Sequence, residues 1–505
     1  METKNISPHP GLLKSIILAI KQVPQFFRKP EEVHKLLLKM ANNSPEGFVP
    51  ILFNPFDSML LVKDIALIHP ILKDLEYQNR SGFPIIDYIY FQFIKHLNTL
   101  KGTEPKLKTN MGGITFSNGE EWKRNRRIGL EVMNDPKFLE NSIEPILSST
   151  DDMIKSMIRS KKATQDINKY LSQLGIDVVG KLVFGTELQI FQENPKPTEI
   201  NSKNLVNSVL TMLHAIQAYI YIPFPAKFYS FFKTKAIKKL DEAVHNLAFT
   251  GTILLDKVKK EMNNNRDKEC LAALIFHRYP ELDDVDIQAL LMDLLGAGHD
   301  TTANLVIFTL SLILESNLLI NSDDFQKEIE SITKILPHLD SHTGNINYRT
   351  ILDTIEKNSP IMSSILNESL RLYPLGAIFS RISLSNKEYN INLKDKTYIL
   401  KPGAKLLISP YITGRLKESW GETAETFDPF RFLNLENKPN AFIPFGAGKR
   451  SCIGGRFGIL EARLILFRIF QLCKLEKDAS FQYTDSILAF TLRTKYPVPV
   501  KVSYK

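Results

Sequence analysis

The sequence predicts a mainly α fold with a small β-rich portion. From about residue 136 to residue 265 the apolar side chains follow helical spacing with few breakers. A second helical pattern, Asp283 to Asn317, is apolar on nearly all sides, which is typical of a helix buried in the middle of a domain. Short β-type runs occur around residues 48–62, 398–404 and 487–500. We therefore expect one large helical domain with a few short strands.

Composition agrees with a single large globular domain. The chain has 505 residues, of which 43% are hydrophobic and 24% charged, and it shows no repeat or low-complexity tract. We expect an N-terminal segment, residues 1–45, followed by the domain at residues 46–505. Three cysteines without a Cys-x-x-Cys pair argue against a disulfide framework and favour a reducing compartment.

The N-terminal segment contains one candidate membrane element, from Leu12 to Phe27. It is too short to span a bilayer, since a spanning helix needs about 20 mostly apolar residues, and it contains Lys14 and Lys21. Its apolar residues share one face, so we predict an amphipathic helix that lies on a membrane surface or packs on the core. No cleavage site for a signal peptide follows it. We expect a cytoplasmic protein, with peripheral membrane contact through this helix as an option and no transmembrane anchor.

The net charge of +9 does not point to nucleic acid. Lysine and arginine residues are scattered, and neither a basic arm nor an aromatic and basic platform appears. A local basic face could instead receive an acidic partner protein. Its residues would be Lys123, Arg124, Arg126, Arg127, Lys449 and Arg450. The alternative interpretation is a solvated charged surface.

The early elements follow from local patterns. Residues 48–74 predict a small sheet that leads into a helix. From Gly119, two acidic residues precede a basic run, the order that the helix dipole favours. Trp122 and Arg126 are four residues apart and therefore point from one face of that helix.

The centre of the pattern from Asp283 to Asn317 is rich in poor helix formers. Gly296, Gly298, Asp300, Thr301 and a second threonine together cost a helix roughly 2–3 kcal/mol. A stable fold does not place them there without a reason. We interpret this stretch as a groove that a flat cofactor can approach, because Gly296 and Gly298 carry no side chain. The adjacent His299 is interpreted as a packing residue.

Later elements carry less information individually. Glu368 and Arg371 lie on one helical face, and Tyr373-Pro374 ends that helix. We expect a strand pair around residues 398–404, an apolar helix at residues 457–472 and a final hairpin at residues 487–500 with prolines at its edge.

The most informative stretch is Phe442-Ile-Pro-Phe-Gly-Ala-Gly-Lys-Arg-Ser-Cys-Ile-Gly-Gly455. Its glycines let the backbone turn tightly around Cys452 and present N–H groups to the sulfur. Arg450 and the helix that begins near Gly454 both favour a thiolate. The stretch therefore indicates a cysteine that ligates a metal; the alternative is a buried structural cysteine.

These motifs resemble those of the cytochrome P450 family. Phe445-x-x-Gly448-x-Arg450-x-Cys452-x-Gly454 fits the family's haem-binding signature at every fixed position, and Ala297 to Thr301 resembles its Ala/Gly-Gly-x-Asp/Glu-Thr motif. The resemblance implies the cytochrome P450 fold, a haem domain at residues 46–505, heme b as cofactor and Cys452 as the iron ligand.

The resemblance also implies roles for further residues. Residues that would hold the haem propionates are Trp122, Arg126, Arg381 and Arg450. The remaining cofactor-binding residues would be Ala297, Gly298, Phe445 and Gly454. Asp300 and Thr301 would be catalytic and assist proton delivery. Glu368, Arg371 and Arg431 would form a buried structural triad, in which Phe430 stands where the family often has Glu.

The function that follows is a haem-thiolate monooxygenase that inserts one atom of O2 into a lipophilic substrate. Because no flavin or dinucleotide fingerprint appears, electrons would come from a separate protein of the ferredoxin or flavin reductase type, acting on a monomer. The turn near residues 489–492 would touch substrate, and fatty acids, terpenoids and sterols all stay open. Alternatives are a haem-thiolate isomerase or dehydratase, against which Asp300 and Thr301 argue, and a non-catalytic haem-thiolate sensor.

Overall fold

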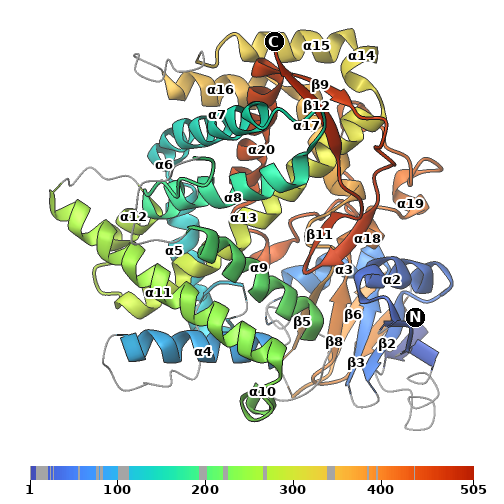
Figure 1. The fold of residues 1–505 in the computed structure, drawn as a ribbon. Helices are drawn as coiled ribbons and strands as arrows, with labels where there is room; N and C mark the ends of the chain where they lie inside the picture. Colours follow the sequence, from blue (N-terminus) through green and yellow to red (C-terminus); the bar gives the residue numbers. More distant parts are fainter. Residues whose placement is uncertain are drawn as a thin grey trace.

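The computed structural model of the chain confirms a mainly α fold with a small β-rich portion (Figure 1). It describes residues 2–6, 21–22, 24–26, 28–54, 57–74, 79, 84–100, 113–115, 117–192, 202–219, 226–264, 270–337, 347–383, 386–393, 396–436 and 438–505. Most of the predicted amphipathic helix at residues 12–27 lies outside these ranges. In the part of the chain so described, none of the helices has the length and apolar character needed to cross a bilayer.

Helices form most of the described body. The α-helices of the first half are α2 (Val33–Asn42), α3 (Ile65–Lys73), α4 (Pro84–Leu100), α5 (Gly119–Met133), α6 (Pro136–Asn141), α7 (Ile143–Arg159), α8 (Ile167–Phe184), α9 (Ser202–Tyr219), α10 (Ala226–Phe231) and α11 (Lys235–Asn264). Those of the second half are α12 (Leu271–Arg278), α13 (Asp284–Glu315), α14 (Leu318–Asn321), α15 (Asp323–Thr333), α16 (Tyr348–Asn358), α17 (Pro360–Leu372), α18 (Pro410–Thr413), α19 (Lys417–Trp420) and α20 (Gly455–Leu472). Short 3-10 turns are η1 (Pro30–Glu32), η2 (Arg431–Leu433) and η3 (Gly448–Arg450).

The strands form small sheets, two of which lie beside α2 and α3 (Figure 1). The first has the order β2 (Phe48–Asn54), β3 (Asp57–Val62), β8 (Lys405–Ile408), β5 (Phe379–Ile382). The second has the order β1 (Glu2–Ile6), β7 (Lys396–Leu400), β6 (Tyr389–Leu393). The predicted sheet and helix at residues 48–74 are confirmed, because β2 and β3 pair antiparallel and α3 follows.

Two of the predicted strand pairings are wrong. Strands β7 and β8 flank the turn at residues 401–404 but belong to different sheets, because β8 pairs with β5 and β3. The final hairpin is shorter than predicted: β10 (Ser486–Ala489) pairs with β11 (Thr491–Thr494). Val500 lies in β12 (Pro499–Tyr504), which joins β4 (Gln165–Asp166) and β9 (Cys473–Lys477) instead. Pro497 lies between the two structures, and Pro499 is the first residue of β12, a strand position at which proline is tolerated.

Helix α13 runs through the middle of the molecule, as its nearly all-round apolar pattern predicted (Figure 1). The Asp283 side chain caps its first turn by accepting a hydrogen bond from the Asp286 amide at 2.8 Å. Helix α8 crosses α13 so closely that a Cβ at Gly175 would lie 2.2 Å from the carbonyl oxygen of His299. Glycine at this position therefore sets the distance between the two helices.

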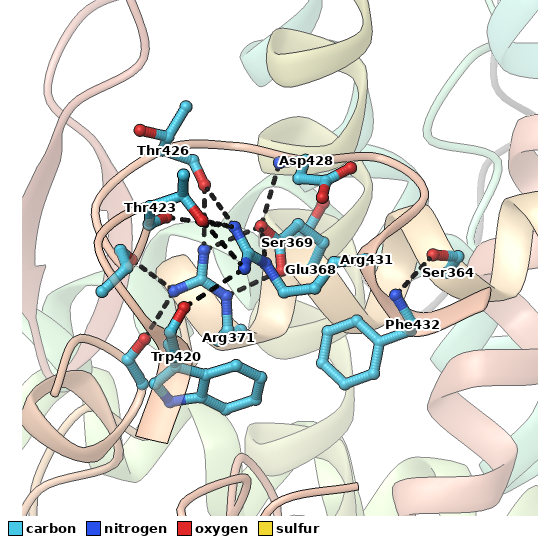
Figure 2. A network of polar contacts seen from close by, with 12 residues as sticks. Ser364, Glu368, Ser369, Arg371, Trp420, Thr423, Thr426, Asp428, Arg431 and Phe432 are labelled. Atoms are coloured by element: carbon cyan, nitrogen blue, oxygen red, sulfur yellow. Dashed lines mark hydrogen bonds and ion pairs between the residues drawn. The ribbon is translucent and has the colours of Figure 1, made fainter. Parts of the chain in front are cut away.

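A buried ion triad fixes the loop that leads toward the cysteine stretch (Figure 2). Glu368 on α17 accepts two hydrogen bonds at 2.7 Å from Arg371 and one at 3.1 Å from Arg431. Its Oε1 also accepts from the Asp428 amide at 3.0 Å. The side chains of Glu368 and Arg371 have no exposed surface.

The remaining donors of the triad are used on loop carbonyl groups. Arg371 donates to the carbonyl oxygens of Gly414 and Thr426 at 2.6 and 3.0 Å, and Arg431 donates to that of Thr423 at 3.0 Å (Figure 2). The guanidinium of Arg371 has five N–H donors, and each can take a partner here, so its charge is compensated inside the protein. The arrangement ties residues 414–432 to α17.

Replacing Glu368 with alanine tests this compensation. The variant leaves the fully buried Arg371 without its carboxylate, so we expect the free energy of unfolding to fall by about 3–5 kcal/mol. The matched control is Glu356→Ala, which removes an exposed pair with Arg456 on neighbouring elements and is expected to cost less than about 1 kcal/mol. Denaturant unfolding followed by circular dichroism measures both. Equal losses in the two variants would contradict the role of the triad.

Candidate active site

One cavity of about 470 Å³ lies between α13 and the cysteine stretch. Its wall is built by α5, α8, α13, β5, α20 and the turn between β10 and β11, with the loop that carries Cys452. Most of the predicted site residues line it together. They are Trp122, Arg126, Ala297, Gly298, Asp300, Thr301, Arg381, Phe445, Arg450, Cys452 and Gly454. Glu368, Arg371 and Arg431 lie outside it, in the triad.

The cysteine loop is a tight, hydrogen-bonded turn. The amide of Gly446 donates to the carbonyl oxygen of Ile443 at 2.9 Å, and the amide of Cys452 donates to that of Phe445 at 2.8 Å. Gly448 has a φ of +68°, and a Cβ there would lie 1.9 Å from the carbonyl oxygen of Leu72 on α3. Only glycine fits both conditions. The turn presents the side chain of Cys452 to the cavity, immediately before the N-cap of α20 at Gly454.

Arg450 and Trp122 form one stacked unit in the cavity wall. The guanidinium carbon of Arg450 lies 3.8 Å from the centroid of the indole ring. Arg450 donates to the carbonyl oxygen of Ser117 at 2.7 Å and to the Asn118 side chain at 2.8 Å. Both Arg450 and Trp122 are buried. The cysteine loop is therefore joined directly to the start of α5.

Two further guanidinium groups face the same cavity. Arg126, one turn after Trp122, donates to the carbonyl oxygen of Ser451 at 2.7 Å. Burial lowers the pKa of Arg126, and the neighbouring Cys452 opposes this effect. Arg381 on β5 is buried, with its guanidinium carbon 4.7 Å from the Phe379 ring centroid. Positive charge is thus concentrated at one part of an otherwise apolar cavity.

These groups fit a flat cofactor that carries carboxylates. Trp122 Nε1 is buried and has no hydrogen-bond partner among the described residues, although a buried indole N–H normally donates to an acceptor. A carboxylate between this donor and the guanidinium groups would supply the acceptor. The cysteine sulfur is a soft ligand suited to iron. The donor set is therefore suited to a haem group with its propionates.

The predicted basic face is smaller than expected. Lys123 pairs with Glu120 at 2.6 Å, Arg124 pairs with Asp286 at 3.2 Å, and Arg450 is buried in the cavity wall. Among the named residues, Lys123, Arg127 and Lys449 are exposed. Acids pair with two of the six cations and burial removes Arg450 from the surface, which the charge pattern alone does not reveal.

The centre of α13 keeps helical hydrogen bonding despite its glycines and threonines. The Thr301 hydroxyl donates to the carbonyl oxygen of Ala297 at 2.7 Å, which leaves its oxygen as an acceptor at the cavity. The adjacent Asp300 is buried, and its carboxylate accepts hydrogen bonds from Thr491 and Arg493 on β11. A Cβ at Gly296 would meet nothing within 4 Å, so the cavity reaches the helix backbone there.

His299 is a packing residue in the structure. It is buried, and its Nδ1 lies 3.3 Å from the carbonyl oxygen of Leu295 one turn earlier. Burial lowers its pKa, so the ring is held neutral. His299 is buried because it lies where α8 crosses α13.

Three polar groups at the site escaped the sequence analysis. Thr491 and Arg493 contact Asp300 across 191 and 193 residues of sequence, separations at which a single sequence gives no signal. Glu461 on α20 is buried against the cavity, and burial raises its pKa to about 7 while a hydrogen bond with Thr302 lowers it. A glutamate within the predicted apolar helix at residues 457–472 was the available clue.

A further acid, Asp293 on α13, also lines the cavity. Its Oδ2 accepts hydrogen bonds from the amides of Ile114 and Thr115 at 2.7 and 2.8 Å, and its Oδ1 accepts from the Tyr90 hydroxyl at 3.0 Å. These bonds hold the loop before α5 against α13. The rest of the wall is largely apolar, with Val179, Leu182, Leu213, Leu488 and Phe490.

Comparison with known proteins agrees with this geometry. Residues 90–497 match the family model described as Cytochrome P450. "Cytochrome P450 3A6" of Oryctolagus cuniculus is 27% identical over 385 residues, which cover 72% of this chain and 70% of the relative. "Cytochrome P450 52-M1" of Starmerella bombicola is 25% identical over 393 residues, covering 73% and 70%. "Protein LUTEIN DEFICIENT 5, chloroplastic" of Arabidopsis thaliana is 25% identical over 488 residues, covering 89% and 72%.

The family model covers most of the chain, and its range includes the helix α5, the centre of α13, the triad and the cysteine loop. The fold and the cavity donors agree with the same assignment. The chain belongs to the cytochrome P450 family.

Proposed function

We propose that the protein is a haem-thiolate monooxygenase that inserts one atom of O2 into a lipophilic substrate with electrons from a separate donor protein. Members of the family use heme b and are monooxygenases. The observation that supports the proposal best is the shared cavity, which brings Cys452 together with Asp300 and Thr301. A ligand for iron and groups that can hold protons thus meet one apolar space.

Each cofactor-binding residue has a role that its chemistry supports. Cys452 would bind the iron as thiolate, and Trp122, Arg126, Arg381 and Arg450 would hold the propionates. Ala297, Gly298, Phe445 and Gly454 are small or flat groups that would pack against the porphyrin plane. When bound, heme b supplies the activation of O2 and the oxidation of substrate.

The chain's own contribution is to orient the substrate, limit water and supply protons. Apolar side chains on α8, α9 and the β10–β11 turn favour a lipophilic substrate, with fatty acids, terpenoids and sterols as candidates. Thr301 offers a hydroxyl at the cavity, and the preceding residue, Asp300, also lines it. This acid and alcohol pair favours a monooxygenase over an isomerase or dehydratase, which needs no protons from solvent.

The proposal includes the electron donor and the form of the enzyme. A ferredoxin or flavin reductase would donate electrons to a monomer. Arg127 and Lys449 are exposed cations beside the cysteine loop and α5 that could meet an acidic donor surface.

One experiment tests the function directly. The haem-loaded protein is screened with fatty acids, terpenoids and sterols for a shift of the Soret band to shorter wavelength. Compounds that shift the band are then incubated with NADPH and a surrogate reductase, and oxygenated products are measured. Binding without NADPH use and without product across the panel would favour a sensor.

Replacing Cys452 with serine tests the iron ligand. The hydroxyl oxygen is a harder and weaker donor than a thiolate, so we expect the red-shifted band of the reduced carbon monoxide complex to disappear. Cys270→Ala, which alters a buried cysteine at the start of α12, is the control and should keep the band. A band that survives in the Cys452 variant would assign the iron to another ligand.

Replacing Trp122 with phenylalanine tests the unpaired indole donor. The ring that stacks on Arg450 is kept while the N–H is removed, so one hydrogen bond to a charged group is lost, worth about 1.5–3 kcal/mol. We expect haem to transfer to apomyoglobin at least about tenfold faster. The control is Trp420→Phe, whose indole donates to the carbonyl oxygen of Thr413 in another part of the fold. Unchanged haem loss in the Trp122 variant would place the propionates elsewhere.

Replacing Thr301 with alanine tests the cavity hydroxyl. We expect substrate binding to change little, while most of the electrons from NADPH appear in hydrogen peroxide in place of product. Product formed per NADPH consumed measures this with any compound that the screen identifies. Equal coupling in the variant and the wild type would remove the role of the hydroxyl.

A further inference from the structure

We propose that Arg493 and Thr491 on β11 are positioning residues that hold the carboxylate of Asp300 at the cavity and connect it to solvent. The inference rests on the proposed function, because it assigns the residues that control the proton supply of that site. It concerns the hairpin formed by β10 and β11, which contributes a wall of the cavity through its turn.

Both oxygens of the Asp300 carboxylate are engaged by this hairpin. Arg493 Nη2 donates to Oδ1 at 2.8 Å, and the Thr491 hydroxyl donates to Oδ2. The two residues are separated by Leu492 and therefore lie on the same face of β11, while Leu492 is buried on the other face. The strand geometry thus directs two donors to one carboxylate.

The ion pair joins the cavity to the outside of the protein. The Asp300 side chain is 6% exposed and lies in the cavity wall, whereas the side chain of Arg493 is 22% exposed. Thr491 also lines the cavity. A continuous polar path therefore runs from the cavity through the carboxylate to a guanidinium group that reaches solvent.

Burial makes the carboxylate dependent on its partner. A buried carboxylate is costly unless it is paired and hydrogen-bonded. Without Arg493 the carboxylate would have to turn toward other donors, and its place at the cavity would no longer be fixed. A group that supplies protons must lie within hydrogen-bond reach of their destination, directly or through one water. Removing the guanidinium of Arg493 should therefore slow proton supply in the same way as removing the carboxylate of Asp300.

The hairpin itself is anchored independently of this pair. The Leu492 amide donates to the carbonyl oxygen of Leu375 at 3.0 Å, and β10 and β11 pair along their length. Lys495, near the base of the hairpin, pairs with Glu32 at 3.3 Å and Asp485 at 3.6 Å. Lys495→Gln therefore removes the same charge from the same hairpin without a contact to Asp300.

The first test needs no activity. Hydrogen exchange of the hairpin amides at residues 486–494 is measured in the haem-loaded wild type, Asp300→Asn, Arg493→Gln, the double variant and Lys495→Gln. We expect each single variant at the ion pair to exchange about tenfold faster and the double variant to exchange no faster than either, because they remove one shared interaction. Lys495→Gln should stay within about twofold of the wild type. If exchange in the double variant were instead accelerated by the product of the two single effects, the pairing of Arg493 with Asp300 would be overturned.

The second test measures proton supply without a substrate. With a surrogate reductase, the enzyme reduces O2 at the expense of NADPH (NADPH + H⁺ + O2 → NADP⁺ + H2O2), and this reaction takes up protons. We expect Asp300→Asn and Arg493→Gln to lower peroxide release at least about fivefold and to raise its solvent deuterium isotope effect, since proton delivery becomes slower. Arg493→Lys should restore both values in part, and Lys495→Gln should leave them unchanged.

The outcomes separate the two proposals. If the wild type takes up no electrons from NADPH, the proposed function fails, while the exchange experiment still decides whether Arg493 holds Asp300. If peroxide release and its isotope effect in Arg493→Gln match those of Lys495→Gln, Arg493 has a merely structural role.

Thr491→Val, which keeps the shape of the side chain and removes the hydroxyl, should show a smaller change of the same kind in peroxide release. No change would exclude Thr491 from the positioning role.

Discussion

The buried carboxylate of Glu368 is the constraint on which the rest of the site depends. Two guanidinium groups compensate its charge, and their remaining donors are used on loop carbonyl oxygens between residues 414 and 426. The path of the chain from α17 to the cysteine loop is therefore fixed by charge compensation around a buried carboxylate. Gly448, which fits against the carbonyl oxygen of Leu72, fixes the other end of that path. Cys452 is presented to the cavity between these two points.

A second constraint is the combination of an apolar cavity with a few charged groups of fixed position. Arg126, Arg381 and Arg450 gather near the cysteine loop, whereas the acids at the cavity belong to α13 and α20. In a space of low polarity, each charge acts over a longer distance than in water and must be compensated locally. Stacking on Trp122 and bonds to backbone carbonyl oxygens hold Arg450 without neutralising it. A ligand with carboxylates can therefore still be attracted.

Sequence reasoning was most successful where a residue type at a fixed spacing has few physical explanations. The glycines around Cys452 and the poor helix formers inside α13 indicated a site, and the family resemblance added Trp122 and Arg126. The structure places residues of all three segments along one cavity. The partners of β7, β8 and β12 were not predicted, because short strands pair across long sequence separations that no local pattern encodes. The buried Glu461 was missed for a related reason, since an apolar helical face gives no sign of which polar residue it buries.

The contact of Asp300 with the last hairpin shows how far such long-range pairing reaches into the chemistry. The motif at Ala297 to Thr301 specifies an acid, but a motif cannot specify what keeps a buried acid in place. That function is supplied 191 residues later by β11, whose neighbouring turn faces the same cavity. Under the proposed function, this segment would contact substrate and also hold the acid that supplies protons, so one substitution in it could affect both tasks. Such residues lie outside the recognisable motifs, and they are found by tracing the partners of each buried charge.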